Sequence, residues 1–495
     1  MPLLTELYRP SLMLLTDLYQ LTMAAAAWGS GAARRQTVFH LHFREAPFDG
    51  GFTVAAGLEL VLELVESARL EPGDLEYLAG LRGADDAPLF EDEFLAYLSR
   101  LPLDVDIDAV PEGTVVFPQE PLLRVTGPVI PCMLLETPLL NLLNFQTLIA
   151  TKAARICLAA GDDPVLEFGL RRAQGPDGAV SASRAAYIGG CAATSNLLAG
   201  RLLGIPVRGT HAHSWVMLFG DEREAFEAYA RTMPGNTAFL VDTYDTLEGV
   251  RHAIEVAGWL KARGKPFLGV RIDSGDLAWL SNEVRRMLDA AGFPEAKIYA
   301  TNELDEHLIE SLKQQGASIG VWGVGTRLVT AHDDPALGGV YKLSLVREPA
   351  GAWQPRIKLS EQAAKISTPG RLQIRRFTDA QGALADMIHD EEISQPTRTM
   401  VDPLDPTRRR TLPDDCPFTE ILIPVARKGR RTAGPESLDA IRARVREQLG
   451  LFHAGVKRFL NPHRYPVGLE QRLYDRRTEL ILATRRISRA TSGAT

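Results

Sequence analysis

From residue 165 onward, short apolar runs rich in β-branched residues alternate with helical stretches, and this alternation restricts the possible folds more than any other feature. Near-continuous apolar strands that alternate with helices indicate parallel strands covered on both faces. Six consecutive runs favour a barrel over an open sheet, and residues 338–346 are a candidate for one further strand. The apolar runs are residues 165–170, 205–210, 238–243, 266–273, 297–302 and 318–326. The stretches 246–264, 276–292 and 305–316 are amphipathic, and each ends in a glycine, the residue that helix C-termini favour.

The segments on either side of this alternation follow other patterns. We predict an N-terminal mixed α+β domain (1–160), an α/β barrel domain (161–346) and a C-terminal extension that packs on the barrel (347–495). The N-terminal segment predicts helices at 16–28, 57–70 and 89–100, a strand at 37–43, a proline-punctuated β stretch at 103–128 and a long helical region at 132–160. The C-terminal segment predicts helices at 436–449 and 468–485.

Composition excludes several classes of protein. The net charge of −7 argues against a general nucleic-acid binder, and the basic runs 408–410 and 427–431 are interpreted as solvated loop charges. No apolar run reaches the roughly 18 residues of a membrane span, and the N-terminus does not resemble a signal peptide. The four cysteines share no metal-ligand spacing, which is typical of free thiols in a reducing compartment. We therefore expect a cytoplasmic protein that binds neither nucleic acid nor membrane.

Polar and charged residues follow most of the predicted strands. In a parallel barrel these strand ends meet at one face, where binding and catalysis are concentrated. Arginine forks match phosphate and carboxylate oxygens, glycines admit a phosphate close to the backbone, and aspartates suit Mg²⁺ held together with substrate phosphates. The sequence therefore predicts a phosphorylated, anionic substrate. The strand-end residues are Arg171, Arg172, His211, His213, Ser214, Asp242, Thr243, Arg271, Asp273, Asp276, Asn302 and the turn Gly323 to Thr326.

Several motifs resemble the nicotinate phosphoribosyltransferase family in order and spacing, over about residues 12–345. They are LLTDLYQLTM (14–23), EFGLRRAQGPDG (167–178), GTHAHSW (209–215), VDTYDT (241–246), VRIDSGDL (270–277), TNELDE (301–306), GVGTRLVT (323–330) and GGVYKL (338–343). The resemblance implies an irregular parallel α/β barrel of the type II phosphoribosyltransferase kind. It also implies a ligase-class enzyme of NAD salvage. Nicotinate and phosphoribosyl pyrophosphate (PRPP) would give nicotinate mononucleotide and pyrophosphate, coupled to ATP hydrolysis.

The resemblance also implies a Mg²⁺ cofactor, and a homodimer with active sites shared between subunits. His213 matches the histidine that ATP phosphorylates. Tyr19, reaching across from the neighbouring subunit, Thr210 and Arg271 match the nicotinate site, with Arg271 facing the carboxylate. The phosphates of PRPP are expected at Arg171, Arg172, Gly323, Gly325 and Thr326, and the metal or ribose at Asp273, Asp276 and Asp242.

Some positions have a second interpretation. Asp276 is equally explained as the N-cap of the helix that follows it. His211 matches no fixed residue type, and we expect it behind the site or on the surface. The histidine-rich stretch 451–466 is interpreted as a packed tail.

Three other functions remain open at this point. A nicotinamide phosphoribosyltransferase would share the fold, although an arginine favours a carboxylate over a neutral amide. A barrel enzyme of sugar-phosphate chemistry would also need strand-end arginines, but would not use ATP. A nucleotide-sensing relative without catalysis would bind ligand and release no pyrophosphate.

Overall fold

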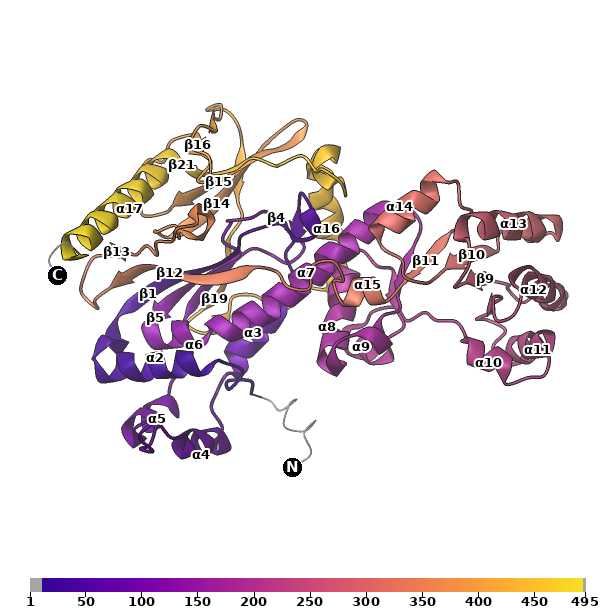
Figure 1. Cartoon of the computed structure of the whole chain (residues 1–495), viewed down its shortest axis with the longest axis horizontal. Helices are drawn as coiled ribbons and strands as arrows, with labels where there is room; N and C mark the ends of the chain where they lie inside the picture. Colours follow the sequence, from indigo (N-terminus) through magenta and orange to yellow (C-terminus); the bar gives the residue numbers. More distant parts are fainter. Residues whose placement is uncertain (1–10, 493–495) are drawn as a thin grey trace. The chain divides into compact units, whose positions relative to one another are not determined.

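The computed structural model describes the backbone of residues 11–492 and the side chains of residues 11–486 (Figure 1). The chain divides into two compact units. Unit 1 contains residues 1–147, 336–437 and 446–495, and unit 2 contains residues 148–335 and 438–445. Unit 1 thus joins segments from both ends of the sequence, while the division predicted at residues 160 and 346 stays a prediction.

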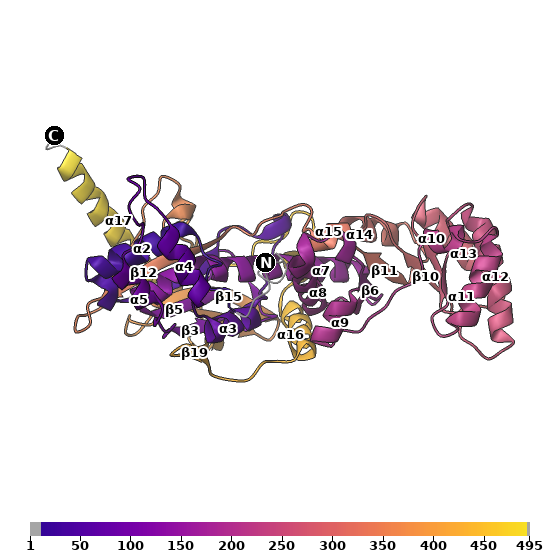
Figure 2. The same ribbon diagram turned by 90° about the horizontal axis from the view of Figure 1, so that it is seen from below.

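Unit 2 is built on a six-stranded parallel sheet with the strand order β7-β6-β11-β10-β9-β8. Five of the six predicted apolar runs form strands of this sheet. The sheet's strands are β6 (Val165–Glu167), β7 (Ala193–Thr194), β8 (Ala238–Leu240), β9 (Gly269–Ile272), β10 (Lys297–Ala300) and β11 (Val321–Val324), and all but β7 correspond to predicted runs. The helices predicted between the later strands are also present, as α12 (Thr246–Lys261), α13 (Leu277–Ala290) and α14 (Glu306–Gln314). Both ribbon views show α12 and α13 side by side next to β9 and β10 (Figure 2).

The sixth predicted run, residues 205–210, forms no named strand but lies between the two edge strands. The amide of Thr194 on β7 donates to the Pro206 carbonyl at 3.0 Å, and the Arg208 amide donates to the Thr194 carbonyl at 3.0 Å. On the other side, the amide of Leu240 on β8 donates to Nε2 of His211 at 3.2 Å. The segment thereby joins β7 to β8 through one backbone bridge and one imidazole. Because this connection replaces a regular strand, the predicted parallel α/β barrel is confirmed as an irregular one.

Unit 1 contains a seven-stranded sheet with the order β13-β12-β1-β5-β3-β19-β20. Its strands are β1 (Gln36–Phe43), β3 (Asp106–Ala109), β5 (Leu123–Pro128), β12 (Gly339–Arg347), β13 (Gln354–Pro355), β19 (Ile423–Arg427) and β20 (Arg430–Arg431). The strand considered for the barrel at 338–346 is β12, which pairs antiparallel with β1 instead. That assignment to the barrel was wrong, because local apolarity does not specify the partner strand.

The helices predicted for the N-terminal segment are present, and α6 (Val129–Leu134) packs against β1 and β5. The predicted helices appear as α2 (Leu18–Gly29), α3 (Leu58–Ser67), α5 (Asp92–Leu98), α6 (Val129–Leu134) and α7 (Glu136–Ala160), with α4 (Pro72–Gly80) in addition. Helices α2, α5 and α6 share an apolar cluster that includes Leu21, Phe94 and Ile130. A two-stranded sheet of β2 (Thr53–Val54) and β4 (Val115–Val116) completes this part.

The C-terminal segment forms a second sheet of unit 1, which the sequence did not predict. Its order is β17-β16-β21-β15-β14-β18. The strands are β14 (Leu372–Asp379), β15 (Gly382–Asp390), β16 (Thr399–Val401), β17 (Arg409–Thr411), β18 (Phe418–Glu420) and β21 (Val467–Glu470). The two predicted helices are present as α16 (Leu438–Leu451) and α17 (Gln471–Ser492). None of the helices within residues 11–492 is both long and apolar enough to cross a membrane.

Candidate active site

The polar strand ends of unit 2 surround a cavity of about 450 Å³. Parallel strands bring their carboxyl ends to one edge, which explains why residues at the ends of five strands meet there. The cavity contains most of the residues predicted for the site: Arg171, Arg172, Thr210, Arg271, Asp273, Gly323, Gly325 and Thr326. It is also lined by Phe168, Leu170, Ser195, Gly209, His211, Ala212, Thr301, Asn302 and Glu303.

Arg271 on β9 presents a largely buried guanidinium to this cavity. Its Nη1 donates to the Thr210 hydroxyl at 2.5 Å and to the His211 carbonyl at 3.3 Å. Its Nε is buried and has no hydrogen-bond partner within residues 11–486. Burial lowers the pKa of Arg271, while Asp273 and Asp242 oppose that shift. The side chain is thus oriented by two bonds and keeps donor capacity for an anionic group.

Asp273 and Asp242 have different positions. Asp273 lines the cavity, and its Oδ1 accepts a short hydrogen bond from the Thr301 hydroxyl. Asp242 lies behind it, with Oδ2 accepting from the Asp273 amide at 2.8 Å and from the Ser274 hydroxyl at 2.7 Å. Asp242 therefore holds the loop that carries Asp273.

His213 is the first residue of the short helix α10 (His213–Met217). Its Nδ1 lies 3.2 Å from the Thr243 hydroxyl, and its Nε2 lies 3.8 Å from Oδ2 of Asp273. The side chain is 39% exposed, so a soluble phosphate donor has access to it. His213 is thus linked to the cavity through Asp273, although it does not line the wall.

His211, two residues earlier, is a buried structural residue. Its Nδ1 lies 3.4 Å from the Ala212 carbonyl while Nε2 accepts from the Leu240 amide, and this pattern requires the neutral ring. The pKa of His211 is lowered to about 4, mainly by burial, with the hydrogen bond to the Ala212 carbonyl opposing the shift and Arg271 and His213 adding to it. The ring packs beside Phe226, Tyr229 and Phe239. Of the two expected positions for His211, the surface one was wrong.

Gly323 on β11 and Gly325 directly after this strand lie where a side chain would meet neighbouring groups. A Cβ on Gly323 would lie 2.6 Å from Cγ2 of Thr301 and 2.8 Å from the Phe168 ring. Gly325 precedes the four-residue helix α15 (Thr326–Val329), and a Cβ there would approach the Phe168 carbonyl to 3.2 Å. Thr326 donates from its hydroxyl to Oε1 of Glu303 at 3.0 Å. The turn is therefore packed tightly against the strand end that carries Phe168.

Sequence reasoning missed Glu167 and the residues that follow β7. Glu167 is almost completely buried, and its carboxylate accepts from the Gly169 amide, the Ser183 hydroxyl (2.8 Å) and the Thr194 hydroxyl (2.5 Å). It thereby fixes the turn that leads to Arg171. No sequence pattern indicates Ser195 as a site residue, because the two-residue strand before it, β7, is too short to show a periodicity.

Asn302 and Glu303 were accessible to sequence reasoning, because both directly follow a predicted strand. Asn302 lines the cavity with a backbone φ of 119°, which is rare for a residue other than glycine. Such strain is concentrated at functional sites.

Comparison with known proteins identifies the family. Residues 14–144 match the model of the nicotinate phosphoribosyltransferase N-terminal domain, and residues 371–477 match that of its C-terminal domain. The chain is 41% identical to the nicotinate phosphoribosyltransferase of Bacillus subtilis over 477 residues, 95% of each chain. The chain belongs to the nicotinate phosphoribosyltransferase family.

Other family members agree over most of the chain. The nicotinate phosphoribosyltransferase of Dictyostelium discoideum is 39% identical over 522 residues, which cover 93% of this chain and 87% of that protein. The crystal structure of human nicotinic acid phosphoribosyltransferase superposes with a TM-score of 0.80 at 33% identity, covering 94% of this chain and 99% of that one. Family membership removes the alternative of an unrelated sugar-phosphate enzyme.

Besides His213 and Asp242, two further predicted site residues, Tyr19 and Asp276, do not line the cavity. The Asp276 side chain accepts from the Trp279 amide at 3.1 Å and caps α13, as its second interpretation predicts. Tyr19 lies on α2 of unit 1, where it is 47% exposed. Its contact with substrate across a subunit boundary stays a prediction.

The side chains of the described residues do not form a metal-binding cluster by themselves. Within the described part of the chain, no group of three or more His, Cys, Asp or Glu side chains could hold a metal ion. Mg²⁺ is commonly held by one or two carboxylates together with substrate phosphates. Asp273, which faces the cavity with a side chain 32% exposed, fits that kind of site.

Proposed function

We propose that this chain transfers the phosphoribosyl group of PRPP to nicotinate and releases pyrophosphate, in NAD salvage. The observation that carries the proposal is the position of Arg271 in one cavity with Arg171, Arg172 and the Gly323–Thr326 turn. A cation for the nicotinate carboxylate and several groups for phosphate are thereby available on the same wall. The names of the close relatives support the same reaction.

The reaction needs positioning and charge more than proton transfer. The pyridine nitrogen of nicotinate has its own lone pair and attacks the anomeric carbon as the bond to pyrophosphate breaks. Positive charge develops on the ribose and negative charge on the leaving group. Arg171 and Arg172 are placed to stabilise the leaving group, and Arg271 with Thr210 to hold the ring in line.

ATP coupling is proposed to proceed through His213. In the proposed reactive tautomer, Nδ1–H donates to the Thr243 hydroxyl, and Nε2, which faces Asp273, carries the free lone pair. Nε2 attacks the γ-phosphorus of ATP, ADP leaves with the bond's electron pair, and water later hydrolyses the phosphohistidine. A phosphate on Nε2 adds negative charge close to the cavity. When bound, Mg²⁺ would neutralise substrate phosphates, with Asp273 as the carboxylate that this chain supplies.

A homodimer is proposed from exposed apolar side chains. On α2 of unit 1, Leu18, Tyr19 and Met23 are between 39% and 53% exposed. On α9 (Leu197–Leu203) of unit 2, Leu197, Leu198 and Leu202 are between 49% and 74% exposed. Apolar groups exposed side by side on helices are typical of subunit interfaces. Sedimentation velocity tests this proposal, and a monomer at micromolar concentration would contradict it.

The test is pyrophosphate release from PRPP with nicotinate or nicotinamide, each with and without ATP. We expect release with nicotinate that ATP stimulates. Release with nicotinamide alone would assign the chain to the amide-specific reaction. No release with either base, with ATP still bound, would favour a sensing role.

His213→Ala tests the coupling step separately. We expect the variant to lose stimulation by ATP and to keep a slower, uncoupled transfer, because His213 does not line the cavity. His252→Ala is the matched control, since His252 pairs with Glu222 at 3.1 Å and is not a lining residue. Full ATP stimulation in His213→Ala would rule out the phosphohistidine.

A further inference from the structure

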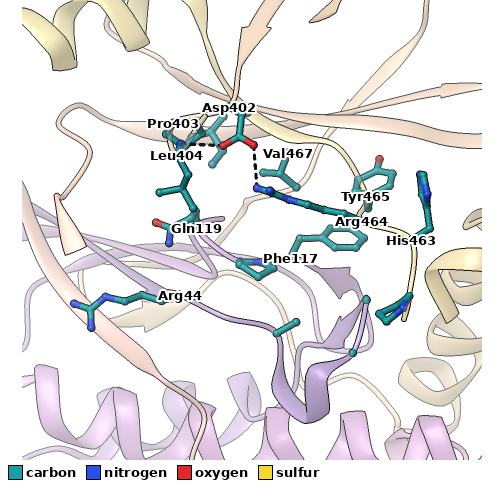
Figure 3. Close-up of a pocket in the computed structure, with 17 residues that line it drawn as sticks. Arg44, Phe117, Gln119, Asp402, Pro403, Leu404, His463, Arg464, Tyr465 and Val467 are labelled. Atoms are coloured by element: carbon teal, nitrogen blue, oxygen red, sulfur yellow. Dashed lines mark hydrogen bonds and ion pairs between the residues drawn. The ribbon is translucent and has the colours of Figure 1, made fainter. Parts of the chain in front are cut away.

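A second cavity, of about 320 Å³, lies entirely within unit 1 (Figure 3). It shares no lining residue with the candidate active site. Its walls are largely apolar and come from separate parts of the chain, namely residues 44–51, 117–119, 388, 402–404 and 462–468. Asp402, Arg464, Tyr465 and Val467 line both this cavity and a neighbouring cleft of about 350 Å³. The two hollows therefore adjoin at these four residues, and together we call them the composite cleft.

The first half of the composite cleft is shaped by aromatic and aliphatic groups. The rings of Phe117 and Tyr465 are stacked, with centroids 4.3 Å apart and planes 22° apart. Leu404, which is 43% exposed, lies on the same cavity beside Gln119. The buried Nε2 of Gln119 has no hydrogen-bond partner within residues 11–486. An apolar chamber with one unused amide donor at its edge is suited to a heteroaromatic ring.

The second half is lined by a concentration of arginines. Arg408, Arg409, Arg410 and Arg464 line it, while Asp402 is the acidic group on the same wall. Arg464 pairs with Asp402 at 3.0 Å and Arg408 with Asp405 at 3.1 Å. This half therefore carries a net positive charge in a chain whose overall charge is −7.

Arg409 and Arg410 are exposed to solvent, as the sequence suggested, and both are also oriented by hydrogen bonds. Arg409 donates from Nε to the Pro406 carbonyl at 3.1 Å and from Nη1 to Gln471 at 3.3 Å. Arg410 donates from Nη1 to the Leu384 carbonyl at 3.0 Å. Both lie on β17, in register with β16. Since a guanidinium has five N–H donors, these contacts orient each fork and leave further donors for a ligand.

We propose that the composite cleft binds a mononucleotide. The phosphate lies among Arg408, Arg410 and Arg464, and the base enters the apolar cavity beside Phe117 and Leu404. Arginine forks match phosphate oxygens, and the combined volume lies in the range of small-molecule sites. The proposal adds a ligand site to unit 1 and does not depend on the transferase reaction proposed for unit 2.

Hydrogen-exchange mass spectrometry of the full chain tests the proposal, because it reports where a ligand acts. The probes are AMP, inorganic phosphate and adenosine at equal concentrations. We expect AMP to slow amide exchange in peptides covering 400–411 and 462–468, more strongly than either phosphate or adenosine does. Protection confined to unit 2, or absent, would overturn the site. Equal protection by phosphate and AMP would overturn the nucleotide assignment.

Paired variants separate binding at the cleft from effects on folding. Arg408→Glu with Arg410→Glu should raise the AMP concentration for half-maximal protection by at least about tenfold. Arg430→Glu, at an exposed position of the same unit, is the control for a surface charge reversal and should change nothing. Leu404→Trp should block the base position, while Leu482→Trp, at a site 49% exposed, should not. Unchanged protection in both cleft variants would refute the proposal.

Discussion

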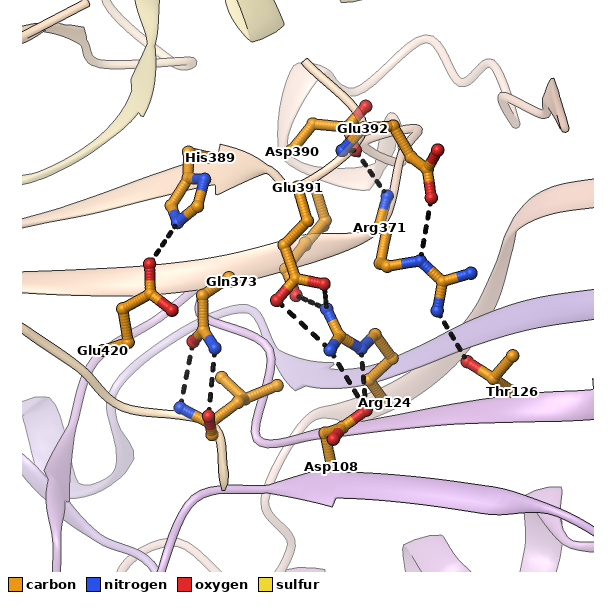
Figure 4. A network of polar contacts seen from close by, with 12 residues as sticks. Asp108, Arg124, Thr126, Arg371, Gln373, His389, Asp390, Glu391, Glu392 and Glu420 are labelled. Carbon is orange, nitrogen blue, oxygen red and sulfur yellow. Dashed lines mark hydrogen bonds and ion pairs between the residues drawn. The ribbon is translucent and has the colours of Figure 1, made fainter. Parts of the chain in front are cut away.

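Arg124 in unit 1 and Arg271 in unit 2 are both largely buried arginines on strands, but their surroundings differ. Arg124 donates to Asp108 (3.0 and 3.2 Å), to the Glu391 carboxylate (2.8 and 3.3 Å) and to the Leu372 carbonyl (3.1 Å) (Figure 4). Arg271 donates to one hydroxyl and one carbonyl, and its buried Nε has no partner among the described residues.

This difference separates a structural arginine from one available to a ligand. Arg124 connects β5 and β3 of one sheet to the segment after β15 of the other, so its bonds hold the two sheets of unit 1 together. Burying a guanidinium with unused donors is unfavourable unless another group completes its bonds. At Arg271 that group is expected to be the substrate carboxylate.

The largest effect is expected from Arg124→Met. The substitution keeps most of the side-chain volume but leaves Glu391 without its arginine and Asp108 with Arg427 alone. We expect the free energy of unfolding to fall by about 4 kcal/mol, measured by urea denaturation. Activity of the folded fraction should be unchanged. Arg430→Met, at an exposed position, is the control. A loss below 1 kcal/mol would show that the network does not stabilise unit 1.

Arg271→Ala should reduce activity and leave stability almost unchanged, the opposite of what we expect for Arg124→Met. We expect kcat/KM for nicotinate to fall about 100-fold, close to 3 kcal/mol, with little change in the melting temperature. Arg263→Ala, an exposed arginine that stacks on Trp259, serves as the control in the same unit. If Arg271→Ala unfolded the protein while the nicotinate KM of the remainder stayed normal, Arg271 would be structural like Arg124.

His211 predicts a pH dependence of stability. Its pKa is about 4 in the folded protein against 6.5 as the ordinary value, so the unfolded chain binds more protons between these two pH values. Neutral His211 makes its full contribution to the free energy of unfolding above pH 6.5. This contribution falls by roughly 2–3 kcal/mol as the pH decreases toward 4. His211→Gln should remove this part of the acid sensitivity, measured as the unfolding free energy at pH 7 and pH 4.5. Identical pH profiles for both proteins would refute the assignment.

The smallest effect is expected at Asp276. As the N-cap of α13, its replacement by alanine should cost about 1 kcal/mol of stability, whereas Asp276→Asn keeps a capping oxygen and most of that stability. Activity distinguishes the cap from the predicted metal or ribose role. A large, Mg²⁺-dependent loss of kcat/KM in both variants would support the metal role, and near-normal activity in both would leave only the cap.

Much of unit 2 could be predicted because its signals are local. Each long strand has an apolar run, each helix an amphipathic pattern, and each strand end a polar residue, so the sequence alone identifies Arg171, Arg271, Asp273 and Thr326 as strand-end residues of one cavity. The second sheet of unit 1 could not be found in this way. Its order joins β21 near the C-terminus to β15 and β16, and such pairings depend on contacts far apart in sequence.

The sequence by itself determined the strand and helix alternation, the parallel sheet of unit 2 and the type of chemistry at its strand ends. Only the tertiary structure decided that His211 would be a buried, neutral link between the 205–211 segment and β8, and that His213 would face Asp273. It also assigned β12 to the sheet of unit 1 and gathered the arginines of residues 408–410 with Arg464 at one cleft. The reason is physical: local patterns set which backbone conformation a segment prefers, whereas burial and hydrogen-bond partners depend on segments distant in the chain.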